Sequence, residues 1–235
     1  MLAAGVSVTA LDRNSRELVG EGLACRRGER LVFVGVSFRL PPGGALLLSG
    51  ANGSGKTSLL RLLATLITPA EGRLVWADAP VRADVNEYRA ALHYVGHQDG
   101  VKPHLTPRET LTFWAALHSR EARPRSGQPI DEALAFFGLE AVADGPCRWL
   151  SAGQRKRLAL ARLVAASAPI WLLDEPTSGL DRESQLRLEH ALREHRASGG
   201  LVVMASHTPV SMPEADILNL ESFSPSANDA GFAWK

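Results

Sequence analysis

An eight-residue stretch constrains this chain more than any other: Gly50-Ala51-Asn52-Gly53-Ser54-Gly55-Lys56-Thr57, with the spacing G-x-x-x-x-G-K-T. Residues 45–48 before it are apolar, as in a buried parallel strand, and residues 58–63 after it have helical composition. Strand, glycine loop and helix thus follow in the order that a phosphate-binding loop needs. The glycines permit backbone dihedrals that are closed to other residues and let the backbone approach a phosphate closely.

The residue types of this phosphate loop (residues 50–57) predict how it binds its ligand. Successive backbone N–H groups form an anion site, and the N-terminus of the next helix adds partial positive charge. We expect Lys56 to reach the β- and γ-phosphates and the Thr57 hydroxyl to ligate Mg²⁺. The alternative is a chance match in a glycine turn, but the flanking strand and helix argue against it. The predicted binding residues are Gly50, Ala51, Asn52, Gly53, Ser54, Gly55, Lys56, Thr57 and Ser58.

Composition limits the class of protein. The chain has 235 residues, 45% hydrophobic and 22% charged, which suits one domain with a sizeable core and room for a subdomain. A net charge of +1 gives no indication of a nucleic-acid partner. Cys25 and Cys147 form no C-x-x-C pair, as expected in a reducing cytosol. We expect no signal peptide and, without 18 consecutive apolar residues, no membrane span.

The pattern along the chain predicts an α/β fold. We expect an N-terminal extension over 1–20, a main domain over 21–220 with a mostly helical insert at about 98–150, and a C-terminal tail over 221–235. Early antiparallel strands beside parallel core strands predict a mixed sheet. The clearest helix start is Thr106-Pro107-Arg108-Glu109, an N-cap and capping box. Expected strands are 31–34, 36–40, 45–48, 72–76, 92–95, 170–173 and 201–205; expected helices are 107–118, one ending near 138, 151–167 and 182–197.

A second chemical group follows the apolar residues 170–173. Asp174, at the end of a buried strand, could contact Mg²⁺ through water, and Glu175 could polarise an attacking water. Taken alone, a strand that ends in a charged turn is an equally good interpretation. The Asp174-Glu175 pair is preceded in the chain by Leu150-Ser151-Ala152-Gly153-Gln154, which we call the signature segment. It is followed by Ser178-Gly179-Leu180-Asp181 and by His207.

With Gln98 and the phosphate loop, these motifs resemble the complete set of the ATP-binding cassette family over about residues 23–220. The resemblance implies a RecA-like mixed-sheet core, a small antiparallel β subdomain and a helical subdomain. It also implies a pair of cassettes, with ATP between the phosphate loop of one copy and the signature segment of the other. The resemblance implies a role for each motif residue. Ser151, Ala152, Gly153 and Gln154 would bind the γ-phosphate in trans, and His207 would contact it. Thr57 and Asp174 would bind Mg²⁺, Gln98 would sense Mg²⁺ and water, and Glu175 with Lys56 would be catalytic. For His207 or Gln98 alone, an ordinary polar residue at a strand end would be the better interpretation.

Four local features narrow the resemblance: LACRRGER at 23–30, VGHQDGVK at 95–102, Leu105-Thr106, and alanine at 152 of the signature segment. Together they resemble the ATP-binding subunits of the bacterial haem exporter of cytochrome c maturation. That implies a homodimer bound to integral membrane permease subunits at the cytoplasmic side of the bacterial inner membrane, as a peripheral protein. Whether haem itself moves or a haem-loaded periplasmic chaperone is released stays open. We expect no nucleic-acid partner and no haem ligand in this chain. An ATPase subunit of another exporter, for drugs, lipids or polysaccharide, is the alternative.

Arg27 and the helix that begins at Pro107 need separate interpretation. Most cassettes place an aromatic residue ahead of the phosphate loop to stack on adenine, and Arg27 stands there in this chain. A guanidinium plane can also stack on a base. On the helix from Pro107, we expect Leu111 to pack inward. The helix carries three further large apolar residues: Phe113, Trp114 and Leu117. We expect it, with the loop at 98–102, to receive a helix of the membrane subunit.

Overall fold

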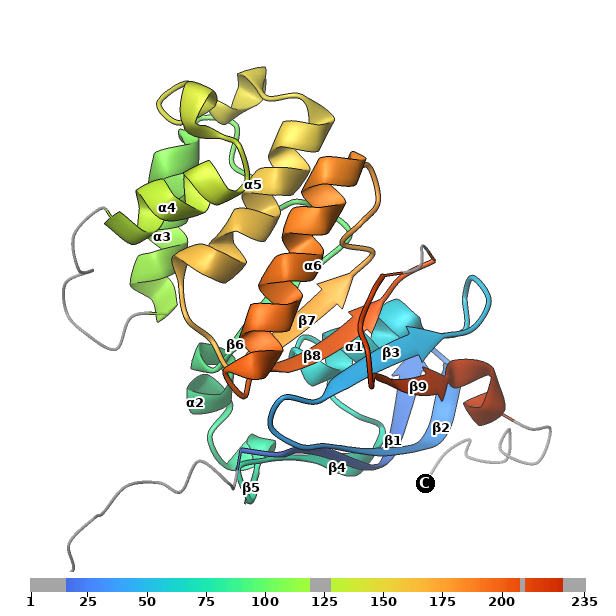
Figure 1. The fold of residues 1–235 in the computed structure, drawn as a ribbon. Helices are drawn as coiled ribbons and strands as arrows, with labels where there is room; N and C mark the ends of the chain where they lie inside the picture. The colour runs from blue at the N-terminus through green and yellow to red at the C-terminus, as the bar shows by residue number, and fades with distance from the viewer. Residues whose placement is uncertain (1–15, 119–127, 208–209, 226–235) are drawn as a thin grey trace, which may run out of the picture.

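The computed structural model describes residues 16–118, 128–207 and 210–225 (Figure 1). The strands are β1 (Leu18–Arg27), β2 (Arg30–Leu40), β3 (Ala45–Ser49), β4 (Glu71–Trp76), β5 (Ala79–Pro80), β6 (Leu92–Val95), β7 (Ile170–Asp174), β8 (Leu201–Ala205) and β9 (Asp216–Asn219). The α-helices are α1 (Lys56–Leu63), α2 (Val85–Ala90), α3 (Pro107–His118), α4 (Gln128–Phe136), α5 (Ala152–Ala165) and α6 (Arg182–Ala197). Short 3₁₀ turns are η2 (Val81–Ala83), η3 (Glu140–Val142), η4 (Cys147–Trp149) and η5 (Leu220–Phe223).

A parallel sheet forms the centre of the molecule. Its strand order is β6-β7-β8-β3-β9, and every neighbouring pair runs parallel. The strands β7 and β8 are buried throughout, which explains their unbroken apolar sequences. Because parallel strands end at the same edge, the residues that follow β3, β6, β7 and β8 gather there.

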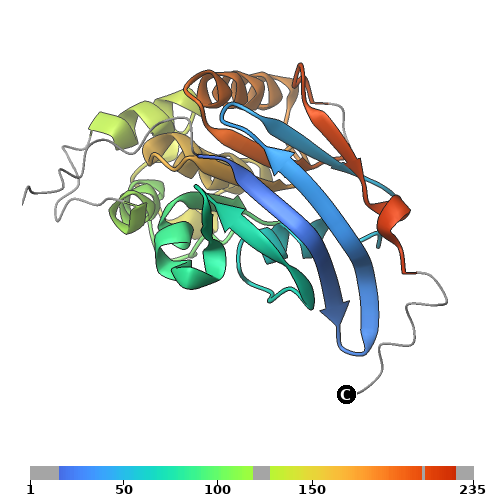
Figure 2. The same cartoon turned by 90° about the horizontal axis from the view of Figure 1, so that it is seen from below.

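Alternate residues of β7 divide the interior into two cores. Ile170 and Leu172 pack into one core with α1 and the antiparallel strands. Trp171 and Leu173 pack into the other core with the helices α4, α5 and α6. The central sheet is thus covered on both faces. Figure 1 shows α3 to α6 above it, and Figure 2, from below, shows β1, β2 and β4 crossing in front.

The antiparallel strands form a sheet of their own, in the order β2-β1-β4-β5. The expected α/β class with antiparallel and parallel strands is confirmed, but the two strand types occupy separate sheets rather than mixing in one. Most of β1 pairs with β2 across a hairpin whose Gly28 has a φ of 59°. β1 already begins at Leu18, inside the stretch assigned to an extension. Residues 1–15 and 226–235, the rest of the expected extension and most of the tail, lie outside the described residues.

The expected helix start at Thr106 is confirmed. Thr106 Oγ1 accepts a hydrogen bond from Glu109 N at 3.1 Å, and Glu109 Oε2 accepts one from Thr106 N at 2.8 Å. Helices α3 and α6 have the expected bounds, whereas α5 ends at Ala165, two residues early. Between α3 and α4, residues 119–127 of the expected helical insert lie outside the described residues.

Two side chains fasten the carboxyl end of α3 and the buried α5 to β6. The Nε2 atom of His118 lies 3.0 Å from Leu92 O. The buried Arg162 guanidinium of α5 donates to Tyr94 O and lies 4.5 Å from the centre of the Trp114 ring of α3. These contacts hold α3, α5 and β6 together.

The amino end of α3 is joined to the stretch before α5 through backbone hydrogen bonds. Cys147 N donates to Leu105 O at 2.8 Å, and Arg148 N donates to Pro103 O at 3.0 Å. The loop that follows β6 therefore bonds directly to η4, which leads into the signature segment.

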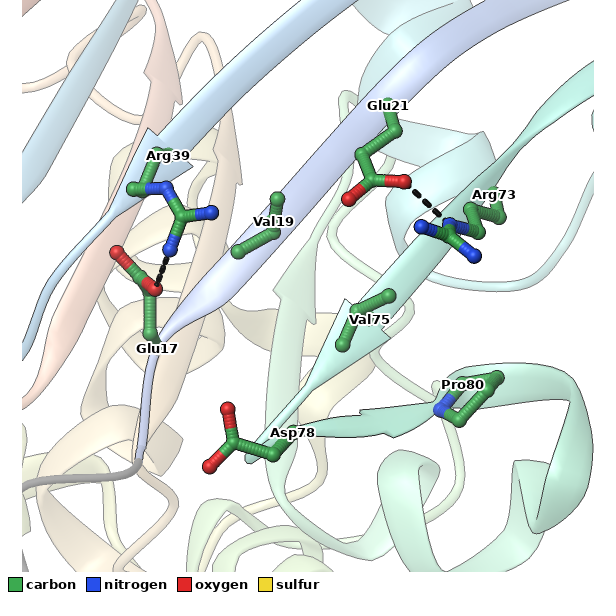
Figure 3. A pocket seen from close by; sticks show the side chains of 8 residues that line it. All are labelled: Glu17, Val19, Glu21, Arg39, Arg73, Val75, Asp78 and Pro80. Carbon is green, nitrogen blue, oxygen red and sulfur yellow. Dashed lines mark hydrogen bonds and ion pairs between the residues drawn. The ribbon is translucent and has the colours of Figure 1, made fainter.

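A hollow of about 270 Å³ lies on the outer face of the antiparallel sheet (Figure 3). Its floor is Val19 and Val75, and ion pairs Glu17–Arg39 and Glu21–Arg73 flank them. None of its lining residues belongs to the motifs that the sequence singled out. Four of its charged side chains form these two ion pairs, and Asp78 also lines it; the hollow adds no chemistry to those motifs.

Candidate nucleotide site

The phosphate loop connects β3 to α1 and depends on its glycines. Gly50, Gly53 and Gly55 have φ values of 126°, 87° and 106°, a region that favours glycine. A Cβ atom on Gly55 would lie 2.8 Å from Val32 Cγ1 and 3.0 Å from Phe33 Cδ1. The loop is therefore pressed against β2, and a larger residue at position 55 would displace it.

Lys56 lies under the turn of the loop. Its Nζ atom donates to Gly50 O at 2.6 Å and to Ala51 O at 3.1 Å. The residue is only 8% exposed. Within the described ranges its ammonium bonds to these carbonyls and forms no ion pair with a carboxylate. A buried positive charge without a negative partner is costly, so binding of an anion would stabilise it.

The loop meets the end of β7 at Thr57. Its hydroxyl donates to Asp174 Oδ1 at 3.1 Å. Asp174 is 2% exposed, and its Oδ2 atom has no hydrogen-bond partner among the described residues. A buried carboxylate oxygen without a partner is costly unless a ligand completes it. A hydroxyl and a carboxylate are the hard oxygen donors that Mg²⁺ takes, so these two residues fit that ion.

Glu175 follows in a strained conformation. Its φ of 51° lies in the left-handed region, which costs of order 1–3 kcal/mol for a residue other than glycine. Its N–H donates to Ala205 O at 2.9 Å, which ties it to the end of β8. Its Oε2 atom accepts from His207 N at 3.1 Å, and its Oε1 atom lies 3.5 Å from His207 Nε2. The structure thus brings Glu175 and His207 together at the edge of the sheet.

A buried lysine that the sequence analysis missed binds the backbone at Glu175. Lys156 Nζ, on α5, donates to Glu175 O at 3.0 Å. Burial lowers the pKa of the Lys156 ammonium. Three carboxylates oppose that shift: Asp99, Asp174 and Glu175. A lysine on the same helical face as the apolar residues 159, 160 and 163 was the signal that could have revealed it.

Gln98 comes after β6 at the same edge, but it is exposed. Within the described part of the chain its side chain makes no hydrogen bond to Thr57, Asp174 or Glu175. The structure therefore places Gln98 at the correct edge without joining it to the expected Mg²⁺ site.

The signature segment opens α5. Ser151 Oγ accepts from Gln154 N at 3.1 Å, and Gln154 Oε1 accepts from Ser151 N at 2.8 Å, a capping box that uses the Gln154 side chain. Ser151 and Ala152 are exposed and Gly153 is half-buried. Figure 1 shows the start of α5 among the upper helices, separated from the phosphate loop at the right of the view. Residues 151–154 therefore do not complete the nucleotide site of their own chain.

Arg27 ends β1 at the tip of the hairpin and is exposed. The next strand, β2, reaches the phosphate loop through Val32 and Phe33. The hairpin thus meets the loop through Val32 and Phe33, and the Arg27 side chain at its tip is exposed.

Comparisons with known proteins agree with this geometry. The family model described as "ABC transporter" matches residues 33–178. The cytochrome c biogenesis ATP-binding export protein CcmA of Rhodospirillum rubrum is 52% identical over 212 residues, 90% of this chain and 88% of that protein. CcmA of Cupriavidus necator is 45% identical over 205 residues, 87% of this chain and 88% of that protein. A dimeric ATP-binding cassette solved in a post-hydrolysis state with ADP and Pi superposes with a TM-score of 0.72 at 26% identity, covering 81% of this chain and 88% of that one.

Proposed function

This chain belongs to the ABC transporter family and, within it, to the cytochrome c biogenesis ATP-binding export proteins, and from that membership we propose what its ATPase drives. It is an ATP-binding and ATP-hydrolysing cassette. We propose that it powers a membrane complex that exports haem, or that releases a haem-loaded periplasmic chaperone, in the biogenesis of c-type cytochromes. The single observation that carries the catalytic part is the Thr57–Asp174 contact beside the Glu175–His207 pair.

Each residue of this edge then has a role in hydrolysis. Lys56 exchanges the carbonyls of Gly50 and Ala51 for oxygens of the β- and γ-phosphates, and the loop amides bind the remaining charge. Glu175 accepts a proton from the attacking water. His207, bonded to Glu175 through its backbone N–H, contacts the γ-phosphate.

We propose that Thr57 and Asp174 hold Mg²⁺, with Gln98 reaching it when nucleotide is bound. When present, the ion neutralises charge on the β- and γ-phosphates. The partnerless Oδ2 atom of Asp174 supports this assignment.

We propose that the active form is a homodimer, because residues 151–154 lie away from the phosphate loop of their own chain. The exposed N-terminus of α5 offers backbone N–H groups and partial positive charge to an anion. In a pair of cassettes, Ser151, Ala152 and Gly153 would face the γ-phosphate held by the other copy. The dimeric cassette solved with ADP and Pi supports this arrangement.

We further propose that α3 presents the surface for the membrane subunits. Leu111 is fully buried, as expected, whereas Phe113 and Leu117 are 50% and 58% exposed. Lys102 Nζ lies 5.8 Å from the centre of the Phe113 ring, so the loop after β6 borders the same patch. Among the described residues, no helix is long and apolar enough to cross a membrane. From its similarity to the CcmA export proteins, we propose that the chain works as a peripheral subunit on the cytoplasmic side of the bacterial inner membrane.

The test replaces Phe113 by Asp in the full chain, expressed with its membrane subunits. We expect ATP binding by the isolated chain to persist, while copurification of the membrane subunits and assembly of c-type cytochromes fall together. The control is Leu186→Asp, because Leu186 of α6 is 48% exposed and lies outside this surface. Intact copurification of a folded Phe113→Asp protein would place the docking surface elsewhere. Normal cytochrome c assembly in a strain without this chain would favour a different exporter.

A further inference from the structure

The C-terminal segment makes a direct contact with the phosphate loop. Ala51 N donates to Glu221 Oε1 at 2.6 Å, a hydrogen bond between residues 170 positions apart. Its acceptor is a carboxylate, and hydrogen bonds to charged groups are stronger than those between neutral groups. The motif G-x-x-x-x-G-K-T allows any residue at position 51, so the motif does not predict this contact.

The fold builds this contact rather than leaving it to a loose tail. Strand β9 pairs with β3 in parallel register up to Ser49 and Asn219, so both chains leave the sheet at the same edge. Asn219 Oδ1 then accepts from Glu221 N at 3.0 Å, and Leu220 is fully buried. The backbone of Glu221 is thereby fixed beside the first turn of the loop.

The Gly50–Ala51 turn is consequently held by two charged groups. The Lys56 ammonium binds the carbonyls of Gly50 and Ala51, and the Glu221 carboxylate binds the Ala51 N–H. When a triphosphate draws Lys56 toward its oxygens, the carbonyls lose their share of that ammonium. The bond to Glu221 does not depend on Lys56 and continues to hold the turn.

We propose that Glu221 is a positioning residue that preorganises the phosphate loop through Ala51 N–H, so that the C-terminal segment sets the affinity for nucleotide. The proposal rests on the ATP site described above. Because Glu221 acts on the loop and not on the reacting atoms, it affects binding more than turnover.

The experiment measures ATP affinity, KM and kcat of the full chain with Glu221→Ala. We expect the ATP dissociation constant and KM to rise about 3- to 10-fold, the range of one net hydrogen bond, with kcat little changed. Glu221→Gln, which keeps an acceptor oxygen, should lose less. Asp216→Ala is the control, since it removes an exposed carboxylate of β9 that has no contact with the loop.

A second variant makes the test specific to the Ala51 donor. Ala51→Pro removes the N–H, so Glu221→Ala should have no further effect on ATP affinity in that background. Unchanged affinity of Glu221→Ala would overturn the proposal, and so would a full effect that persists beside Ala51→Pro. A wild-type chain that binds no ATP would instead contradict the nucleotide site itself.

Discussion

Glu175, the proposed general base, has a strained backbone conformation because three neighbours hold it there. Ala205 O binds its amide, Lys156 binds its carbonyl and His207 N binds its carboxylate. Strained backbone conformations occur mostly at functional sites. The strain at Glu175, at the edge of the sheet, therefore agrees with a catalytic role. The side chain is oriented before nucleotide arrives.

Replacement of Glu175 by Gln should therefore remove the base without disturbing the site. We expect turnover to fall by roughly 10²–10⁴-fold, a barrier increase of about 3–5 kcal/mol, while ATP binding and the dimer persist. The measurement is steady-state ATP hydrolysis with the membrane partners present. Glu132→Gln on the exposed face of α4 is the control. Near-normal turnover by Glu175→Gln would remove this residue from the role.

The elements β6, α3 and α6 bury two histidines in neutral form. His93 Nε2 lies 3.0 Å from Ala166 O, and burial, with His118 next, lowers its pKa to about 3. Arg162 and His195 face it and act in the same direction. The His195 ring stacks on Trp171 at 3.8 Å, and burial lowers its pKa to about 4. Both rings are expected to be neutral in the folded chain at neutral pH.

These depressed pKa values make stability depend on acidity. Below the ordinary histidine pKa of 6.5, the unfolded chain binds protons that the folded chain refuses, so stability falls as pH falls. We expect a loss of about 1 kcal/mol for each histidine by one pH unit below 6.5. Thermal unfolding of the nucleotide-free chain across this range measures it. The double variant His93→Gln and His195→Gln should show a flatter dependence; an equal slope would assign the effect to other groups.

In the proposed homodimer, the phosphate loop of one copy and the signature segment of the other form the two halves of each site. Variants should be able to inactivate each half separately. Lys56→Ala should weaken ATP binding within a chain, because it removes the lysine ammonium that binds the phosphates. Ser151→Arg should leave monomer binding intact and block closure. A mixture of the two should regain one composite site in each mixed dimer, seen as hydrolysis that neither variant shows alone. Loss of ATP binding by Ser151→Arg alone would contradict the trans arrangement.

Local signals made much of this fold predictable. The glycine loop, the capping residues of α3 and the apolar runs of β7 and β8 are each decided within a few residues. The clustering of Thr57 with Asp174 was also predictable, because parallel strands share one edge.

What escaped prediction depends on contacts between distant parts of the chain. β1 has three register shifts between Gly20 and Arg26 in its pairing with β2, which hide its alternation. β9 is mostly exposed and short, with no apolar run to mark it. Glu221 is assigned its contact only by the pairing of β9 with β3, so the residue looked like part of a tail.

The two backbone hydrogen bonds between residues 103–105 and 147–148 have a mechanical consequence. They tie the segment after Gln98 to the segment before Ser151, and backbone pairs of this length resist stretching far more than flexible side-chain contacts do. In the proposed homodimer, these bonds would pass a shift that begins at Gln98 in one copy to Ser151 of the same copy, which we propose faces the nucleotide of the other copy. Occupancy of one proposed site would then be felt at the other through the backbone of the chain, and the two sites would close together.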